Sequence, residues 1–372
     1  MLKSFKTLLI FSSLLIFIFS AYERFYPANI EGKDIVYKTS YLIEEDTVLD
    51  EEDLISNSLD DVALLVAGGA RVTIRPGRTI SKKVSQENEN LEKTDNYKYG
   101  LTSTIVAIGS GTKVIIEKAK INVDASFSNA IVALNGASII IKNSTITTKK
   151  KYSKGIVILS DSSVDISGDS IIKTEGSYSP CLELNLKRGY IEGNIFHLSS
   201  KGEGSPLLNT LGDGEIVFNE AKGNAENSQI MVVQGHNAIY IHNSNLNCKG
   251  TNKENNNGGI VLYKNNNDNR LVELESYNSQ FSLINNPQEI PMFYCFNIEA
   301  DITLDNTDTK NGNIFIKAYQ TDDSNINTKV HLFINQKGFE GEIIALDEAK
   351  IILKDDSNLL ANNKITGNVE KQ

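Results

Sequence analysis

The side chains best suited to binding chemistry in this chain are tyrosines. A phenol ring can stack on the apolar face of a sugar while its hydroxyl group stays in water. Tyrosines recur along the later part of the chain, at positions 178, 190, 240, 263, 277, 294 and 319. We take Tyr240, Tyr263, Tyr277 and Tyr319 as the candidate carbohydrate-stacking residues. The alternative is that tyrosine occurs here because it favours β-strands.

Carboxylates gather between Glu44 and Asp53, and oxygen ligands of this kind can bind calcium. The segment lacks the spaced Asp-x-Asp-x-Asp-Gly pattern of a calcium loop, so a solvated cap that protects an open strand is the better interpretation. Nor does the sequence contain a glycine-rich phosphate loop or histidines at metal-ligand spacing; the histidines are His197, His236, His242 and His331. We therefore predict no metal site, no cofactor and no catalytic residue from spacing alone.

The elements that must position these side chains come from a repeat of about 25 residues. Three consecutive copies occupy residues 129–153, 154–178 and 179–204. Each copy contains short apolar runs separated by small polar turns. A unit this short cannot bury a core alone, but stacked units bury one continuous core.

Alternation within each copy predicts the direction of its side chains. Ile139 and Ile141 are in register with equivalent residues of the preceding and following copies, which are Val114, Ile116, Val164 and Ile166. We also place Ile121 beside Ile146, and Ile146 beside Ile171. Asn143 and Asn243 share a turn, as do Asp169 and Asn306 approximately, and Gly68-Gly69, the segment from Gly109 to Gly111, and Gly136 mark another corner.

Stacked apolar columns of this kind predict an all-β chain, a single right-handed parallel β-helix of ten or eleven coils. A left-handed β-helix is the alternative, but it keeps a stricter repeat of about six residues, which this chain lacks. β-Sandwiches and β-barrels fit less well because they do not need like residues at one fixed period.

The chain resembles secreted right-handed parallel β-helix proteins of the pectate-lyase-like fold, most closely uncharacterised adhesin-like surface proteins. The similarity rests on residues 61–74 (DVALLVAGGARVTI), 97–101 (YKYGL) and 139–148 (IIIKNSTITT) and extends over nearly the whole mature chain. Such motifs are needed for the stacking of coils and not for catalysis. The resemblance therefore implies the fold and transfers no catalytic residue.

The resemblance also implies two possible enzyme activities, a hydrolase and a lyase. Polygalacturonase-like hydrolases use paired carboxylates in motifs similar to N-T-D, D-D, G-H-G and R-x-K. Asn306-Thr307-Asp308 and Asp322-Asp323 match in part, but Gly235-His236 precedes them and no Arg-x-Lys follows. Lyases of the fold use calcium and a basic residue, and the arginines here are scarce: Arg24, Arg71, Arg75, Arg78, Arg188 and Arg270.

The chain ends also carry signals. Residues 1–21 have the basic start, apolar run and small residues of a secretory signal peptide, although Phe19 is unusual before the cleavage site and an uncleaved anchor is the alternative. No later stretch could span a membrane. We assign residues 22–60 to an acidic cap and first coil, residues 61–360 to the β-helix with a charged insertion at 81–99, and residues 361–372 to a polar tail.

Composition narrows the range of partners. The formal net charge of −10 argues against nucleic-acid binding, and the densest basic run, Lys149-Lys150-Lys151, suits a solvated turn. Cys181, Cys248 and Cys295 do not form a disulfide framework. Asn143 lies in the one glycosylation sequon.

We expect a secreted or cell-surface, non-catalytic binding or structural module for polysaccharide or another surface component. The alternative is a lyase or hydrolase acting on pectin-like polyuronates.

Overall fold

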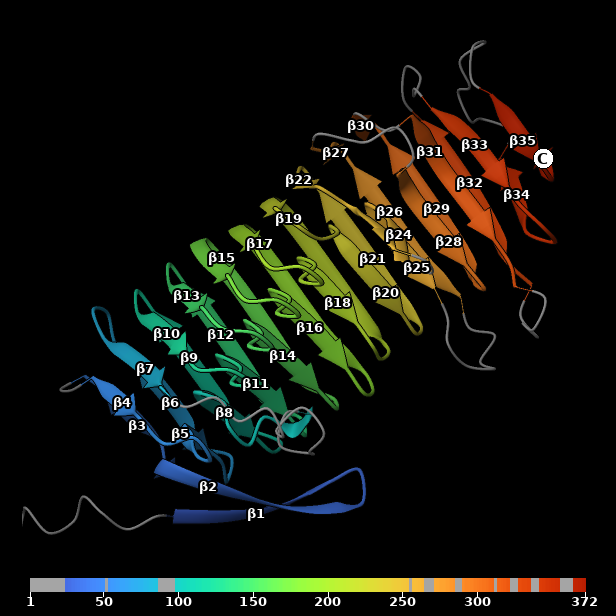
Figure 1. The fold of residues 1–372 in the computed structure, drawn as a ribbon. Helices are drawn as coiled ribbons and strands as arrows, with labels where there is room; N and C mark the ends of the chain where they lie inside the picture. Colours follow the sequence, from blue (N-terminus) through green and yellow to red (C-terminus); the bar gives the residue numbers. More distant parts are fainter. Residues whose placement is uncertain are drawn as a thin grey trace, which may run out of the picture.

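The computed structural model describes residues 24–50, 53–85, 98–253, 256–263, 271–284, 290–310, 313–321, 327–335, 341–354 and 364–372. These residues form a β-solenoid of about 11 turns with almost no helix, which confirms the predicted parallel β-helix. The coils follow one another from the N-terminal to the C-terminal end (Figure 1). The predicted signal peptide, most of the charged insertion, and Asp322-Asp323 lie outside the described residues.

One wall of the solenoid is a sheet that we call sheet A. Apart from the antiparallel pair β1–β2, its neighbouring strands are parallel. Its strands, in order, are β1 (Arg24–Ile30), β2 (Lys33–Ile43), β5 (Val62–Val66), β8 (Ile105–Ile108), β11 (Ile131–Leu134), β14 (Ile156–Leu159), β16 (Leu182–Asn185), β18 (Leu208–Thr210), β20 (Met231–Gln234), β25 (Ile260–Tyr263), β28 (Pro291–Phe296), β31 (Ile314–Tyr319), β33 (Glu342–Ala345) and β35 (Ile365–Gly367).

The other walls belong to one larger sheet and form two columns. Column B contains β3 (Thr47–Leu49), β6 (Arg71–Ile74), β9 (Lys113–Glu117), β12 (Ser138–Lys142), the first parts of β15 (Ser163–Thr174), β17 (Gly189–Ser200) and β19 (Gly214–Ala225), then β21 (Asn237–His242), β26 (Val272–Tyr277), β29 (Glu299–Asp305), β32 (Lys329–Asn335), β34 (Lys350–Leu353) and β36 (Val369–Lys371). The last two strands of the chain, β35 and β36, thus lie within the segment expected as a polar tail.

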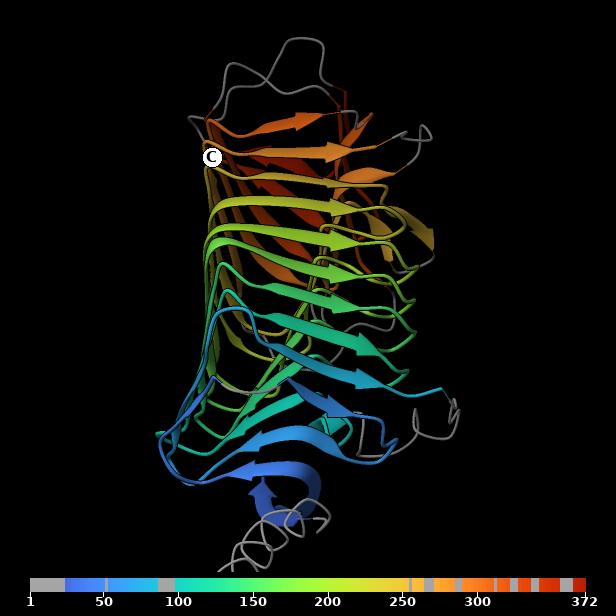
Figure 2. The ribbon, with the colours of Figure 1, turned by 90° about the vertical axis from the view of Figure 1, so that its left-hand side faces the viewer.

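Column C contains β4 (Leu54–Ser56), β7 (Thr79–Lys83), β10 (Lys120–Asp124), β13 (Thr145–Thr148), the second parts of β15, β17 and β19, then β22 (Asn245–Cys248), β27 (Gln280–Leu283) and β30 (Asp308–Lys310). A short antiparallel hairpin, β23 (Thr251–Lys253) and β24 (Asn256–Gly258), interrupts the later coils. Figure 2 shows the coils stacked one above another.

The core lies between the three walls and consists of ladders of inward side chains. Ile139 lies between Val114 and Val164, and Ile121 lies beside Ile146, as the sequence pattern predicted. All of them are at most 1% exposed. Burying such a side chain contributes roughly 1.5–3 kcal/mol, so the ladders are the main source of stability.

The predicted pairing of Ile146 with Ile171 is wrong by one residue. Ile146 pairs with Ile172, which is buried, whereas Ile171 pairs with Thr145 and is 40% exposed. The cause is an extra residue at the corner of this coil, where the pairing shifts between Ser167 and Ser170. A slip of one residue moves every following side chain to the opposite face.

The corners satisfy their buried backbone groups through stacked serines. The N–H of Ser153 donates to Ser179 Oγ at 2.9 Å, and the N–H of Ser179 donates to Ser205 Oγ at 2.9 Å. Ser205 Oγ in turn donates to the carbonyl of Gly176 at 2.9 Å. All three serines are fully buried, so each coil supplies the acceptor that the coil before it needs.

Left-handed backbone recurs at the corner between columns B and C. Asn143 and Asn243 both have φ of 50°, and Asp169 and Asn306 have φ of 59° and 47°. Asparagine and aspartate tolerate this conformation well, which explains their recurrence. Ile195 occupies the same corner with φ of 56°, an unusual conformation for a β-branched residue.

The chain before the first full coil forms a cover rather than a simple end cap. The β1–β2 hairpin crosses the outer face of sheet A (Figure 1), where Asn135 Nδ2 donates to the carbonyl of Asn29 at 2.8 Å. Tyr37 donates to the carbonyl of Tyr99 at 2.8 Å. The hairpin buries a strip of outward apolar side chains on β5, β8, β11 and β14: Leu65, Val106, Ile108, Val132, Leu134, Val157 and Leu159.

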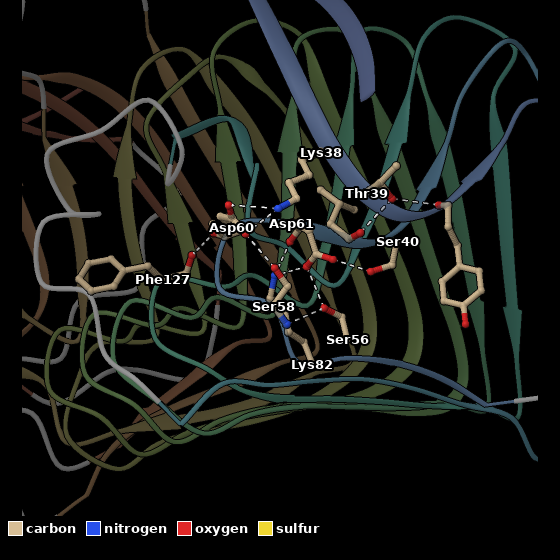
Figure 3. Close-up of polar contacts among 12 residues, drawn as sticks. Lys38, Thr39, Ser40, Ser56, Ser58, Asp60, Asp61, Lys82 and Phe127 are labelled. Atoms are coloured by element: carbon tan, nitrogen blue, oxygen red, sulfur yellow. Dashed lines mark hydrogen bonds and ion pairs between the residues drawn. The ribbon is translucent and has the colours of Figure 1, made fainter. Parts of the chain in front are cut away.

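A buried polar cluster joins this N-terminal part to the first coils (Figure 3). Lys82 points inward from β7 and is fully buried. Its ammonium group donates to the backbone carbonyl of Asp61 and lies 3.2 Å from Asp61 Oδ1. Ser56 donates to the same carboxylate at 2.8 Å and Ser40 at 2.5 Å. All these partners belong to the chain itself, so the role of the cluster is to hold the N-terminal segment to the first coils.

Candidate functional site

The outer face of column B between β15 and β29 carries a dense group of carboxylates and tyrosines, which we call the acidic face. Alternation turns every second side chain of these strands outward. Eight carboxylates occupy the outward positions: Asp165, Glu192, Glu215, Glu273, Glu275, Glu299, Asp301 and Asp305. The same positions contain Tyr190, Tyr240 and Tyr277, and across this set of strands they contain no lysine or arginine.

Strand pairing brings these residues into contact distance along the coil axis. Tyr190 pairs with Glu215, and Tyr240 pairs with Glu275. The hydroxyl of Tyr190 donates to Glu192 Oε2 at 3.1 Å. Neighbouring strands lie about 4.8 Å apart, so one extended ligand could contact several coils at once.

The carboxylates act on one another and on the tyrosines. Partial burial, together with the nearby charge of Glu192, raises the pKa of Asp165. Partial burial also raises the pKa of Tyr190, helped by its bond to Glu192, and the pKa of Tyr240, helped by Glu273, Glu275 and Glu215. The face therefore holds an excess of negative charge.

A hollow of about 450 Å³ opens beside the acidic face, where sheet A turns into column B. Its lining is Arg188, Gly189, Tyr190, Asp213, Gly214, Glu215, His236 and Ala238. Arg188 pairs with Asp161 at 2.6 Å, and the N–H of His236 donates to Asp213 Oδ1 at 3.0 Å. The turn that forms its rim is strained, since Leu186 and Arg188 have φ of 68° and 49°.

The four candidate tyrosines divide between two faces. Tyr240 and Tyr277 lie on the acidic face, and Tyr277 is 46% exposed. Tyr263 and Tyr319 lie on the outer face of sheet A, beside an apolar group that contains Tyr294 and Phe296. Tyr319 stacks on Phe296 with ring centroids 5.7 Å apart, and Tyr263 donates to Gln234 Oε1 at 3.3 Å. One ligand face therefore cannot include all four.

The motif that resembled a hydrolase occupies a corner. Asn306 Nδ2 donates to Asn278 Oδ1 at 2.5 Å, in line with the asparagines of other coils. Thr307 is fully buried and lies 3.0 Å from Ser276 Oγ. The contacts of Asn306 and Thr307 are those of a stacked turn, and His236 lies on another corner, at the hollow.

The acidic segment near the N-terminus supplies caps for backbone groups. Asp46 Oδ1 accepts from the N–H of Arg71 at 2.8 Å, and Asp53 Oδ1 accepts from the N–H of Thr79 at 2.7 Å. These carboxylates take the place that the carbonyls of a preceding coil would fill. Within the described parts of the chain, no group of three or more His, Cys, Asp or Glu side chains could hold a metal ion.

The cysteines are buried and free. Burial raises the pKa of the thiols of Cys181, Cys248 and Cys295 to about 12, so thiolate chemistry is suppressed at neutral pH. The sequence alone did not reveal the acidic face. Its residues appear together only when the outward positions of successive coils are aligned, which needs the length of every turn.

No protein-family model matches the chain, and no curated protein or solved structure matches it. In the part of the chain that the structure describes, no helix is long and apolar enough to cross a membrane.

Proposed function

We propose that the protein is a secreted or cell-surface β-solenoid that binds a glycan along its acidic face. The observation that supports this most is the repetition of tyrosines and carboxylates on consecutive coils beside a hollow of about 450 Å³. Proteins that bind extended polymers need a row of similar contacts, and a solenoid provides such a row on a rigid frame.

The chemistry of the face suits sugars. Tyrosine rings offer flat apolar surfaces for stacking, and carboxylate oxygens accept hydrogen bonds from sugar hydroxyl groups. The strands hold these groups in place before the ligand arrives, so little side-chain freedom is lost on binding. Tyr190 already makes a hydrogen bond to Glu192.

The pectin-like polyuronates considered from the sequence fit this face poorly. A polyuronate carries one carboxylate per sugar, and the acidic face would repel it. A lyase or hydrolase would instead have to act at the hollow, where Arg188, Asp213 and Glu215 are close together. Release of reducing sugar or unsaturated product from any polysaccharide would favour that alternative over a binding module.

Substitution of one outward-pointing ring, the partly buried Tyr240, tests the proposal. We expect Tyr240→Ala to weaken binding to the glycan found on an array by about fivefold, because it removes one stacking contact of roughly 1 kcal/mol. Isothermal titration calorimetry with the full chain measures this change. Tyr319→Ala, the matched substitution on the outer face of sheet A, should leave the affinity unchanged.

Two outcomes would contradict the proposal. One is the absence of binding to any glycan on the array. The other is a loss of affinity in Tyr319→Ala with none in Tyr240→Ala, which would move the site to the outer face of sheet A. Circular dichroism of both variants checks that the strands remain intact.

A further inference from the structure

The sign of the charge on column B changes along the solenoid. Towards the N-terminal end, the outward charges are mainly basic: Arg71, Lys113 and Lys142, with Glu117 the one carboxylate on β6, β9 and β12. Towards the C-terminal end the outward positions carry Lys329 and Lys350, and Lys350 pairs with Glu370 of β36 at 2.7 Å. Between them lie the six strands of the acidic face, which extend over about 24 Å at about 4.8 Å per strand spacing.

The carboxylates inside this segment lack cationic partners on their own strands. Lysines lie at both edges: Lys142 and Lys113 oppose the rise in the pKa of Asp165 at the N-terminal edge, and Lys329 lies 3.9 Å from Glu299 at the C-terminal edge. Between the edges, on β26, Glu273 and Glu275 are exposed and raise the pKa of Tyr240. A cationic group from outside would therefore gain most beside Glu273 and Glu275.

Sugars with hydroxyl groups alone do not require this excess of charge. A neutral glycan needs a few oriented acceptors, and burying extra carboxylates under it would cost solvation. An amino sugar uses both features of the face, because its ammonium group pairs with carboxylates and contacts tyrosine rings while its ring stacks. The hollow lined by Tyr190 and Glu215 offers a deeper subsite beside the row of tyrosines and carboxylates.

We infer that the glycan bound by the acidic face is a cationic one, a polymer of amino sugars whose amino groups are free. This inference rests on the proposed function, because it names the ligand class of the same face. Glu273 and Glu275 would then determine the preference for charge, and Tyr240 would supply stacking between them and the hollow.

The test compares oligomers of glucosamine with oligomers of N-acetylglucosamine of equal length, using the full chain. We expect the free-amine oligomer to bind at least about tenfold more tightly, and this ratio to fall about tenfold in the double variant Glu273→Gln/Glu275→Gln. Glu220→Gln, an exposed carboxylate at the corner beyond this face, is the matched control and should keep the ratio.

The outcomes separate the two proposals. Equal affinity for both oligomers, or a ratio that survives the double substitution, overturns the inference and leaves glycan binding intact. Failure to bind any oligosaccharide overturns the proposed function as well. Lysine oligomers that bind as tightly, without dependence on Tyr240, would show a general cation surface and also overturn the inference. The ratio in the unmodified chain should shrink as salt rises, which needs no variant.

Discussion

Lys82 departs most from the pattern of the residues around it. It pairs with Val123 of the next coil, so a charged side chain occupies an inward position that other coils fill with smaller residues. Burial lowers its pKa from 10.5 to about 8, although Asp61 works in the opposite direction. The ammonium group is tolerated because Asp61 and its serine partners surround it (Figure 3).

This shift predicts a dependence of stability on pH. Between pH 8 and 10.5 the unfolded chain holds the Lys82 proton and the folded chain does not, so the free energy of unfolding should rise with pH in this window. Below pH 8 both states are protonated and the cost of burial is fully present. Ionisation of Tyr37 and the buried thiols works in the opposite direction, because burial raises their pKa values.

The contribution of Lys82 is isolated by comparison with Lys82→Met. Urea denaturation at several pH values should show that the unmodified chain gains stability relative to the variant, by up to about 1.4 kcal/mol per pH unit within the window. A difference between the two proteins that stays constant from pH 8 to 10.5 would show that Lys82 does not titrate there.

At the scale of elements, column C carries a ladder of alternating charge. In each coil, the residue directly after the last inward side chain of the column C strand points outward. In chain order these residues are Lys83, Asp124, Lys149, Glu175, Lys201, Glu226 and Lys249. Each of the five inner charges thus lies between two of opposite sign. Lys149, which the sequence suggested only as part of a solvated turn, is one member. Nearby lysines hold the pKa of Glu175 below its usual value, Lys173 most strongly through a direct hydrogen bond.

Reversal of one charge tests whether this ladder stabilises the stacking of coils. Glu175→Lys would place three lysines in succession and should destabilise the chain by about 1 kcal/mol at low salt, because like charges on paired strands repel. Glu175→Gln, which removes the charge without reversing it, is the control. The gap between the two urea midpoints should narrow in high salt, and a gap independent of salt would refute an electrostatic ladder.

The elements differ in how far the sequence could predict them. Inward ladders repeat at fixed positions, so the fold and the pairing of Ile139 with Val164 could be predicted from periodicity. The pairing of Ile171 could not, because one extra residue at its corner reverses the pattern. The placement of the β1–β2 hairpin over sheet A depends on contacts between distant segments, which no local pattern records.

At the scale of the whole molecule, the solenoid separates stability from recognition. The inward side chains form one core, and the three outer faces have different chemistry. Sheet A is apolar and covered by the hairpin near the N-terminus, column B is acidic with tyrosines from β15 to β29, and column C is alternately charged. The sequence predicted tyrosines as binding residues, but only the structure shows that Tyr240 and Tyr277 share a face with the carboxylates while Tyr263 and Tyr319 do not.

The most direct test of glycan binding by the acidic face is a crystal structure of the full chain with a bound glucosamine oligomer. We predict an oligomer that lies across column B, with one sugar on Tyr240 and its amino groups near Glu273 and Glu275. An oligomer seated on Tyr263 and Tyr319 of sheet A, or bound away from both faces, would contradict it.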